Sequence, residues 1–280
     1  MPVAHLSNSW ETPPVVLVAA AVGLVLFAQA FVRLRRRRPD HAPWTRAALF
    51  AAGLALLVVP LVSPLEQAAD EQLLSAHMLQ HVLIGDAAPA LLVVAVRGPL
   101  LFFLLPPALL RPLAGFRPLR ALLGVLLRPL VTLGLWTVAT YAWHLPSAYD
   151  YAAAHPWAHN LEHLSFLVTG TLVWTQLVDP ARHRRLLRPQ RVFFALAMIA
   201  LTQPLVDVLL FSSGAAYPRY AAQPDRLFGL SPLTDQRLAG VVMMVEQLLA
   251  LGICVALLLR PYLKERHGRL GGPALPHGSR

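Results

Sequence analysis

The chain has 280 residues, of which 56% are hydrophobic and 14% are charged, against roughly 45–50% and about 25% in an ordinary soluble domain. This composition excludes a disordered or strongly solvated protein. The single cysteine, Cys254, excludes an internal disulfide framework and any metal site built from several thiolates. The formal net charge of +10 fits either nucleic-acid binding or a membrane protein with arginine-rich cytoplasmic loops, so the positions of the arginines decide between them.

Seven apolar segments, bounded by charges and prolines, predict the secondary structure. They are residues 15–32, 47–63, 72–96, 129–145, 157–178, 192–211 and 238–259. Each can cross a hydrocarbon core about 30 Å thick, the shorter ones with help from flanking residues. Backbone amides in hydrocarbon must be paired within their own segment, which requires helices. The sequence therefore predicts an all-α, polytopic membrane protein with one bundle of seven transmembrane helices. A shorter apolar run, 98–110, contains Pro106 and Pro107, and we expect it to be interfacial or re-entrant.

The basic residues predict the orientation of this bundle. All but three of the 24 Lys and Arg residues follow the first, third, fifth or seventh segment. The exceptions, Arg219, Arg226 and Arg237, follow the sixth. The positive-inside rule then places the amino terminus outside and the carboxyl terminus in the cytoplasm. We expect residues 1–14 to be an external segment, 15–262 the membrane domain, and 263–280 a cytoplasmic, disordered tail. Because the basic excess is shared among four cytoplasmic stretches, a nucleic-acid partner is not expected.

Histidines gather in the predicted outer half of the bundle. Ionisable side chains inside membrane segments are costly and indicate function. Most of the 11 histidines lie there: His5, His77, His81, His144, His155, His159 and His163. His77 and His81 are four residues apart, as are His159 and His163, so each pair projects from one helical face, about 6 Å apart along the axis. All four imidazoles lie roughly 3–13 Å below the outer surface, where they can meet between the third and fifth segments.

Three explanations fit these histidine pairs. They can hydrogen-bond neighbouring helices together without any ligand. They can bind a metal ion, since imidazole suits copper, zinc and iron, and a thioether from Met78 or Met243 would shift the preference towards cuprous copper. They can also hold a haem between one histidine from each helix. Spacing alone does not separate the metal ion from the haem.

Two carboxylates lie on the helices that carry these pairs. Glu162 lies on nearly the same face as His159 and His163, where it can orient a ligating imidazole or simply satisfy a buried one. Asp86 lies about 140° around the helix from His81, so we expect a separate interhelical contact near the Pro89 break.

Other polar residues reach a similar depth on the remaining segments. Asp207 lies near the outer end of the sixth segment, four residues from Gln203, and this pair can bond the backbone carbonyls that Pro204 frees. Glu246 lies deeper on the seventh segment and can be a ligand, a proton acceptor or a neutral packed group. His144 lies at the outer mouth of the fourth segment.

The order and spacing of several motifs resemble a known family over about residues 47–259. The matching stretches are His77-Met78-Leu79-Gln80-His81 with Ala88-Pro89, Trp143-His144-Leu145-Pro146 through Tyr149-Asp150, His155-Pro156-Trp157 into His159-Asn160-Leu161-Glu162-His163, Tyr217-Pro218 with Tyr220, and Asp235-Gln236 through Ala239-Gly240 to Met243. Together they resemble the bacterial seven-span cytochrome c oxidase assembly factors called CtaG, the type associated with oxidases that carry a fused cytochrome c domain.

The resemblance implies a multi-pass protein of the bacterial plasma membrane that is needed to make active haem-copper oxidase, by handling copper on the outer side. The residues that match the family's shared positions are His77, His81, His159, His163, Asp235 and Gln236. The chain departs from the family's pattern in its last segment, where Met244 and Glu246 stand in place of a frequent tryptophan and proline.

We therefore expect a membrane assembly factor that binds copper, as Cu(I), and passes it to an oxidase subunit, with that subunit or a copper chaperone as outer partner and the lipid bilayer as surroundings. The predicted metal ligands are His77, His81, His159 and His163, with Met78 and Met243 as softer ones. The predicted auxiliary residues are Glu162, His144, Asp207, Asp235, Gln236 and Glu246.

Two other functions remain open at this point. A bis-histidine haem protein for electron transfer would use one histidine from the third segment and one from the fifth. A copper or proton transporter would need a polar path to the cytoplasmic side, where the seventh segment offers mainly Gln247 and Cys254. We do not expect an enzyme, because no nucleophile stands at a recognisable spacing from a base.

Overall fold

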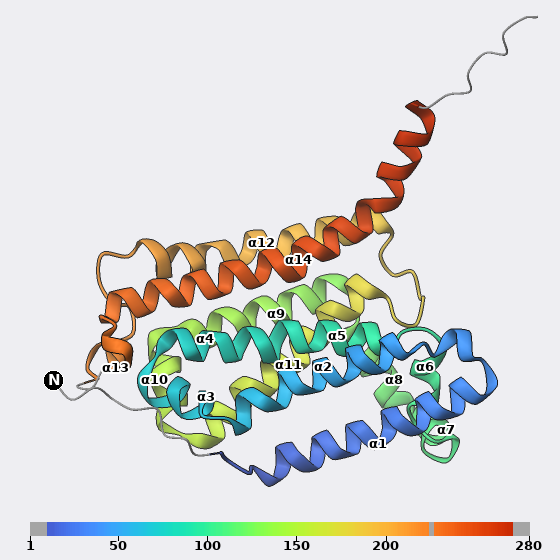
Figure 1. Ribbon diagram of the computed structural model, residues 1–280, viewed down its shortest axis with the longest axis horizontal. Helices are drawn as coiled ribbons and strands as arrows, with labels where there is room; N and C mark the ends of the chain where they lie inside the picture. Colours follow the sequence, from blue (N-terminus) through green and yellow to red (C-terminus); the bar gives the residue numbers. More distant parts are fainter. Residues whose placement is uncertain (1–9, 224–226, 271–280) are drawn as a thin grey trace, which may run out of the picture.

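The computed structural model describes residues 10–223 and 227–270, and within these ranges every regular element is a helix. The long elements are α1 (Pro14–Arg37), α2 (Trp44–Val62), α4 (Leu74–Val82), α5 (Ala88–Val96), α9 (Pro129–His144), α11 (Pro156–Val178), α12 (Arg188–Phe211) and α14 (Pro232–Leu270). Figure 1 shows these helices running side by side along the long axis of the molecule. All seven predicted segments are therefore helical, and the all-α prediction is confirmed.

The connecting segments are short helical turns. They comprise η1 (Pro39–His41), α3 (Leu65–Gln67), the π-helical η2 (Ala68–Gln72) and η3 (Leu83–Ala87), α6 (Pro99–Phe103), α7 (Pro107–Gly115), α8 (Arg117–Leu126), α10 (Pro146–Ala154), α13 (Pro218–Ala221) and η4 (Leu227–Gly229). The run 98–110 is divided between α6 and α7, and neither is long enough to cross a membrane. Many helices start at a proline, for example Pro129, Pro146 and Pro156, because the first helical position needs no N–H donor.

Five helical stretches are long and apolar enough to cross a membrane: Pro14–Arg37, Pro39–Val62, Leu74–Val96, Arg188–Phe211 and Pro232–Leu263. The pair α8 and α9, bent by 74°, makes a sixth if it forms one span. α11 has 23 residues but is more polar, since it carries the histidine pair and Glu162. The chain is therefore a multi-pass membrane protein, and the seventh crossing stays a prediction.

The two ends of the chain extend beyond these helices in different ways. α14 continues as a helix to Leu270, so residues 263–270 of the predicted tail are helical. Residues 271–280, and residues 1–9 of the predicted external segment with His5, lie outside the described ranges. Figure 1 shows α14 bending away from the bundle near its end, where Pro261 interrupts the backbone hydrogen bonds.

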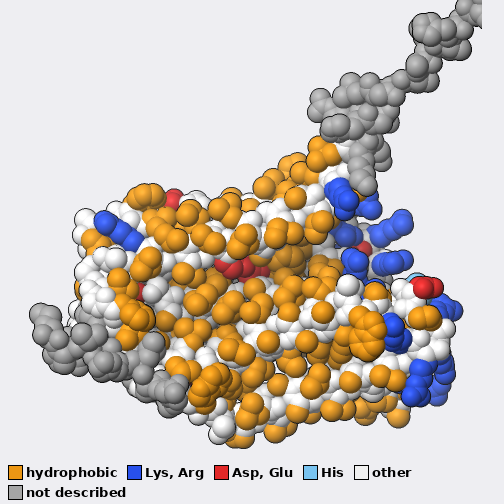
Figure 2. All heavy atoms as spheres, in the orientation of Figure 1, with side chains coloured by type: hydrophobic (Ala, Val, Ile, Leu, Met, Phe, Trp, Pro, Cys, Tyr) orange, Lys and Arg blue, Asp and Glu red, His pale blue; other side chains and the backbone are white. Residues whose placement is uncertain are grey.

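Lys and Arg side chains gather mainly at one end of the molecule. Figure 2 shows most of them beyond the end of α5, opposite the end that carries α10 and α13. The face that Figure 2 shows between the two ends carries mostly hydrophobic side chains. This distribution is that of a protein whose flanks face lipid and whose basic end faces one aqueous side.

The third predicted segment is a single helix with a π-helical interruption. α4 and α5 are joined through η3. Pro89 lacks the N–H that would bond the Gly85 carbonyl four residues earlier, and a π-turn accommodates this break. Gly170 of α11 packs directly against that carbonyl: a Cβ added at Gly170 would overlap the Gly85 oxygen and stand 2.8 Å from the Gly85 carbonyl carbon. The small residues therefore let η3 and α11 approach at backbone distance.

We predict that Gly170→Ala destabilises the protein by about 1–3 kcal/mol, the usual cost of forcing extra atoms into a packed interior. The measurement is thermal unfolding of detergent-purified protein. Gly252→Ala on α14 is the matched control, because an added Cβ there meets nothing within 4 Å. Equal melting of the Gly170→Ala variant and the parent would contradict the proposed backbone contact.

Candidate metal centre

The two histidine pairs face each other across α4 and α11. Ring centroids are 4.1 Å apart between His77 and His81, and 4.2 Å apart between His159 and His163. Across the two helices, His77 lies 5.8 Å from His159, and His81 lies 5.7 Å from His163. The four rings thus form one buried group. Sequence spacing placed each pair on one helical face, and the packing of α11 on η3 and α5, which continue from α4, brings the faces together.

His144 adds a fifth imidazole from the end of α9. Its ring centroid lies 6.0 Å from that of His81. Its Nδ1 is 2.7 Å from the Thr140 carbonyl oxygen, whereas its Nε2 is buried without a partner. The Tyr217 hydroxyl donates a 2.9 Å hydrogen bond to the His144 carbonyl, which fixes the end of α9. His144, which was predicted to be an auxiliary residue, therefore lies beside the histidine pairs.

Glu162 contacts the opposite helix rather than the histidines of its own. Its Oε1 lies 3.3 Å from Nε2 of His81 and 3.8 Å from Nε2 of His77. The side chain is fully buried, with an exposed fraction of 0%. The sequence placed Glu162 next to His159 and His163, but the carboxylate points across to α4, because the α4 and α11 faces are in contact.

Asp70 belongs to the same group and was missed by the sequence analysis. Its Oδ1 lies 3.2 Å from Nε2 of His159, and 37% of its side chain is exposed, so it stands at the rim. Burial raises the pKa of Asp70, and the nearby His159 opposes this shift. Asp70 lies on η2, before the predicted segment 72–96, and the extended backbone of Leu73 separates it from α4. Helical periodicity therefore carries no signal for it.

These residues form what we call the histidine cluster. Its members are Asp70, His77, His81, His144, His159, Glu162 and His163. Two sets of ligand atoms converge within 4.8 Å of one another, Asp70 with His77 and His159, and His77 with His81 and Glu162. The two sets share His77.

Many polar atoms of the histidine cluster lack a hydrogen bond among the described residues. Both nitrogens of His77 and His81, both oxygens of Glu162, and Nε2 of His163 are buried without a hydrogen bond. Buried polar groups are normally paired, and each unpaired one is costly. Imidazole nitrogens and carboxylate oxygens that converge in this way can bind a cation together. The donor set therefore fits a metal ion.

Asp235 does not lie in the histidine cluster but holds the helix that carries it. Its carboxylate accepts hydrogen bonds from the backbone N–H groups of Leu74 (2.8 Å) and Ser75 (3.1 Å) and from the Ser75 hydroxyl. These are orphan donors at the start of α4. Asp235, from α14, thus serves as the N-terminal cap of α4 in place of a residue of α4 itself. Asp235, which was predicted to be an auxiliary residue of the metal site, instead fixes the position of α4.

Gln236 connects three further segments from the same buried position. Its Oε1 accepts a 2.6 Å hydrogen bond from the N–H of Ala216, and its Nε2 donates to the Leu209 carbonyl at 3.3 Å. The amide therefore ties the start of α14 to the end of α12 and to the loop before α13. Gln236, also predicted to be an auxiliary residue, therefore fixes the relative positions of α12 and α14.

Asp207 and Glu246 lie apart from the histidine cluster. Asp207 is exposed on α12 and accepts a 2.8 Å hydrogen bond from Gln203, so this pair bonds to itself rather than to freed carbonyls. Glu246 hydrogen-bonds to Asp86, which also accepts from the Trp174 indole. Two negative charges side by side repel each other, which disfavours ionisation of both carboxyls at once. The prediction that Asp86 makes a separate interhelical contact is confirmed.

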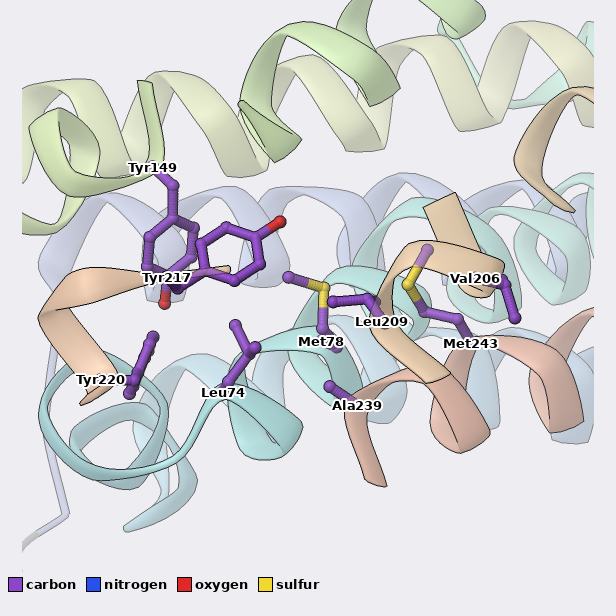
Figure 3. Close-up of a cluster of buried hydrophobic side chains, with 9 residues drawn as sticks. All are labelled: Leu74, Met78, Tyr149, Val206, Leu209, Tyr217, Tyr220, Ala239 and Met243. Carbon is purple, nitrogen blue, oxygen red and sulfur yellow. The ribbon is translucent and has the colours of Figure 1, made fainter. Parts of the chain in front are cut away.

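Met78 and Met243 lie in a buried apolar cluster (Figure 3). Met78 follows His77 but is rotated about 100° from it, and both thioethers pack with Leu209 and Ala239. Tyr149 joins this apolar cluster to the histidine cluster.

Tyr149 forms one wall of the histidine cluster. Its ring stands edge-on to His77, with the ring centroids 4.7 Å apart, and its side chain is almost fully buried. Burial raises the pKa of Tyr149 well above its usual value, so it stays a neutral phenol. In the sequence, Tyr149 is notable only as part of the motif from Trp143 to Asp150, because an aromatic residue in an outer loop predicts no particular contact.

Gln80, within the His77–His81 turn, anchors that turn to the neighbouring α3. Its Nε2 donates a 2.6 Å hydrogen bond to Oε2 of Glu66. Burial, together with nearby Asp70, raises the pKa of Glu66 to about 8. Glu66 was not predicted, because it lies in the connection between two segments.

Comparison with protein families identifies the chain. A family model described as cytochrome c oxidase caa3 assembly factor (Caa3_CtaG) matches residues 25–265. The chain belongs to this family. The match contains the whole histidine cluster and confirms the resemblance found in the motifs. The Caa3_CtaG description indicates a cytochrome c oxidase assembly factor. Comparisons with curated proteins and with solved structures gave no match.

We predict that Asp235→Ala lowers stability by about 1–2 kcal/mol, as expected for loss of a helix cap. The change leaves the Leu74 and Ser75 N–H groups without an acceptor. Asp235→Asn keeps one acceptor oxygen and should cost less. Thermal unfolding in detergent measures both. Asp207→Ala removes the same charge from an exposed site and is the control, and a parent-like melting temperature for Asp235→Ala would disprove the cap.

Proposed function

We propose that this assembly factor binds copper in the histidine cluster and delivers it to cytochrome c oxidase. The observation that carries the proposal is the convergence of unpartnered imidazole and carboxylate atoms from α4, α11 and η2. Copper is the cargo rather than a resident cofactor. The family description supports this choice, because a haem-copper oxidase must acquire copper during assembly.

The donor atoms support copper over calcium or magnesium, because imidazole is a better ligand for copper than for those hard cations. His77, His81, His159 and His163 are the proposed ligands, with Glu162 and Asp70 as carboxylate partners. Met78 and Met243 are the proposed softer ligands, which would favour Cu(I) if either thioether turned towards the imidazoles.

Haem is less well supported by the same geometry. A bis-histidine haem needs α4 and α11 to stand apart to admit the macrocycle between its two ligands. Gly85 and Gly170 instead hold η3 and α11 in backbone contact, about two turns below His163. The compact group of rings suits a bare ion better.

Delivery requires that the ion can leave. Asp70 is partly exposed at the rim and contacts His159, so it joins the buried ligands to the outer surface. A partner with stronger ligands, an oxidase subunit or a copper chaperone, would take the ion there by ligand exchange. This role needs binding and transfer but no catalysis.

The proposal includes seven crossings of the bacterial plasma membrane, with the amino terminus outside and the histidine cluster in the outer half. Its support is the gathering of basic side chains at the end opposite α10 and α13 (Figure 2). α11 would be the seventh crossing, because its two histidines and Glu162 are buried inside the bundle rather than exposed to lipid.

We predict that the two ends react from opposite sides of the membrane. In a Cys254→Ala background, a membrane-impermeant thiol reagent should label Ala154→Cys, exposed in α10, in intact bacterial cells. It should label Ala114→Cys, exposed in α7, only after the cells are permeabilised. Labelling of both positions in intact cells would exclude the proposed orientation.

We predict that His81→Ala combined with His163→Ala lowers copper retention at least tenfold, because two ligands are removed from one ion. The measurement is metal content by mass spectrometry, after anaerobic loading with cuprous ion and desalting. The matched control is His41→Ala with His155→Ala, which removes two histidines outside the cluster.

Three results would decide the matter. Copper held by the parent and control but lost by the variant supports the proposal. Equal copper in all three proteins refutes the site. A strong visible haem band in the purified parent, lost in the His81 and His163 variant, would assign the cluster to haem instead.

A further inference from the structure

A long groove runs along the side of the bundle, away from the histidine cluster. It lies between α5 and α14, and α11 contributes to its wall. Its volume is about 1080 Å³, and its walls consist mainly of leucine, valine and alanine side chains. Figure 2 shows the hollow between α14 and the helix below it, with acidic atoms at its middle. α14 packs on α4 and α12, and the groove opens where α14 passes α5.

The end of the groove is strongly basic. Arg97, Arg188 and Arg191 line it. Arg191 pairs with Asp179 at 2.8 Å, whereas Arg97 and Arg188 have no carboxylate partner among the described residues. Arg46 donates a hydrogen bond to the Arg97 carbonyl, so a further guanidinium stands close by. An apolar groove that ends at unpaired guanidinium groups matches an amphiphile with an anionic end.

The middle of the groove contains the carboxyl pair. Glu246 lines the wall and is hydrogen-bonded to Asp86, whose other partner is Trp174. Repulsion between adjacent carboxylates disfavours a second negative charge at this pair. Most of the groove is therefore lined by apolar side chains, and its positive charge is concentrated at the end that carries the arginines.

We propose that this groove binds a phospholipid with an anionic headgroup. The phosphate lies against Arg97 and Arg188, and the acyl chains lie along the apolar walls formed by residues such as Leu91, Val245 and Leu249. The apolar walls would accept any acyl chain, but the guanidinium groups select negative charge at the headgroup level. The bound lipid fills the space between α5 and α14 and stabilises the helix that supplies Asp235.

The test measures bound lipid on the full chain. Protein purified in mild detergent is extracted and its phospholipids are quantified by mass spectrometry. We expect phosphatidylglycerol to be retained at about one molecule per protein, and Arg97→Gln with Arg188→Gln to reduce this at least fivefold. Arg36→Gln with Arg37→Gln is the control, because it removes equal charge from exposed residues outside the groove.

A second variant separates groove filling from charge. Val245→Trp places a large side chain in the groove and leaves every arginine intact, so it should also lower retention. After delipidation, phosphatidylglycerol should raise the parent's melting temperature more than phosphatidylcholine with the same acyl chains. The double arginine variant should not distinguish the two lipids.

Other outcomes would overturn the proposal. Equal retention in the parent and both groove variants, or equal effects of the two headgroups on the parent, would mean a non-specific lipid shell. Absence of lipid from the parent, with loss of oxidase co-purification in the groove variants, would assign the groove to a helix of the oxidase. Copper retention does not enter any of these measurements, so the lipid and copper proposals can fail separately.

Discussion

The approach of α11 to the π-helical turn at Gly85 is the contact on which the rest of the site depends. Pro89 frees the Gly85 carbonyl, and Gly170 has no side chain to keep that carbonyl away. Two helices can then meet at backbone distance, as small residues allow in membrane bundles. About two turns from this contact, the histidine pairs of α4 and α11 are brought within one cluster. Larger residues at either glycine would separate the helices and disperse the ligands.

The cluster concentrates unpaired polar atoms where they are most costly. Asp235 and Gln236 are buried polar residues that are satisfied by backbone groups of neighbouring segments. In the histidine cluster, by contrast, the ligand atoms of His77, His81 and Glu162 converge on one another. A bound cation would satisfy them, so the packing preorganises ligands that are unfavourable without an ion. This gives the proposed copper function a physical basis within the family's assembly role.

α14 connects the two regions that we interpret functionally. Its first turn supplies Asp235 to the start of α4, and its middle and later turns line the groove that ends at Arg97 and Arg188. A lipid in the groove would support α14 where it diverges from α5. The effect would reach the histidine cluster only through the position of α4, because the groove and the cluster share no residue.

Sequence alone determined the helical class, the approximate bounds of the long helices, and the two histidine pairs. These follow from local rules: apolar length sets a membrane helix, and a spacing of four puts two side chains on one face. Sequence could not show that the pairs face each other, that Glu162 reaches across to His81, or that Asp70 joins them from the π-helical turn η2. Nor could it show that Asp235 caps α4 rather than contacting a ligand. Each of these is a contact between segments distant in the chain, and only the packing of α4, α11 and α14 decides such contacts, since periodicity carries no information about which helices become neighbours.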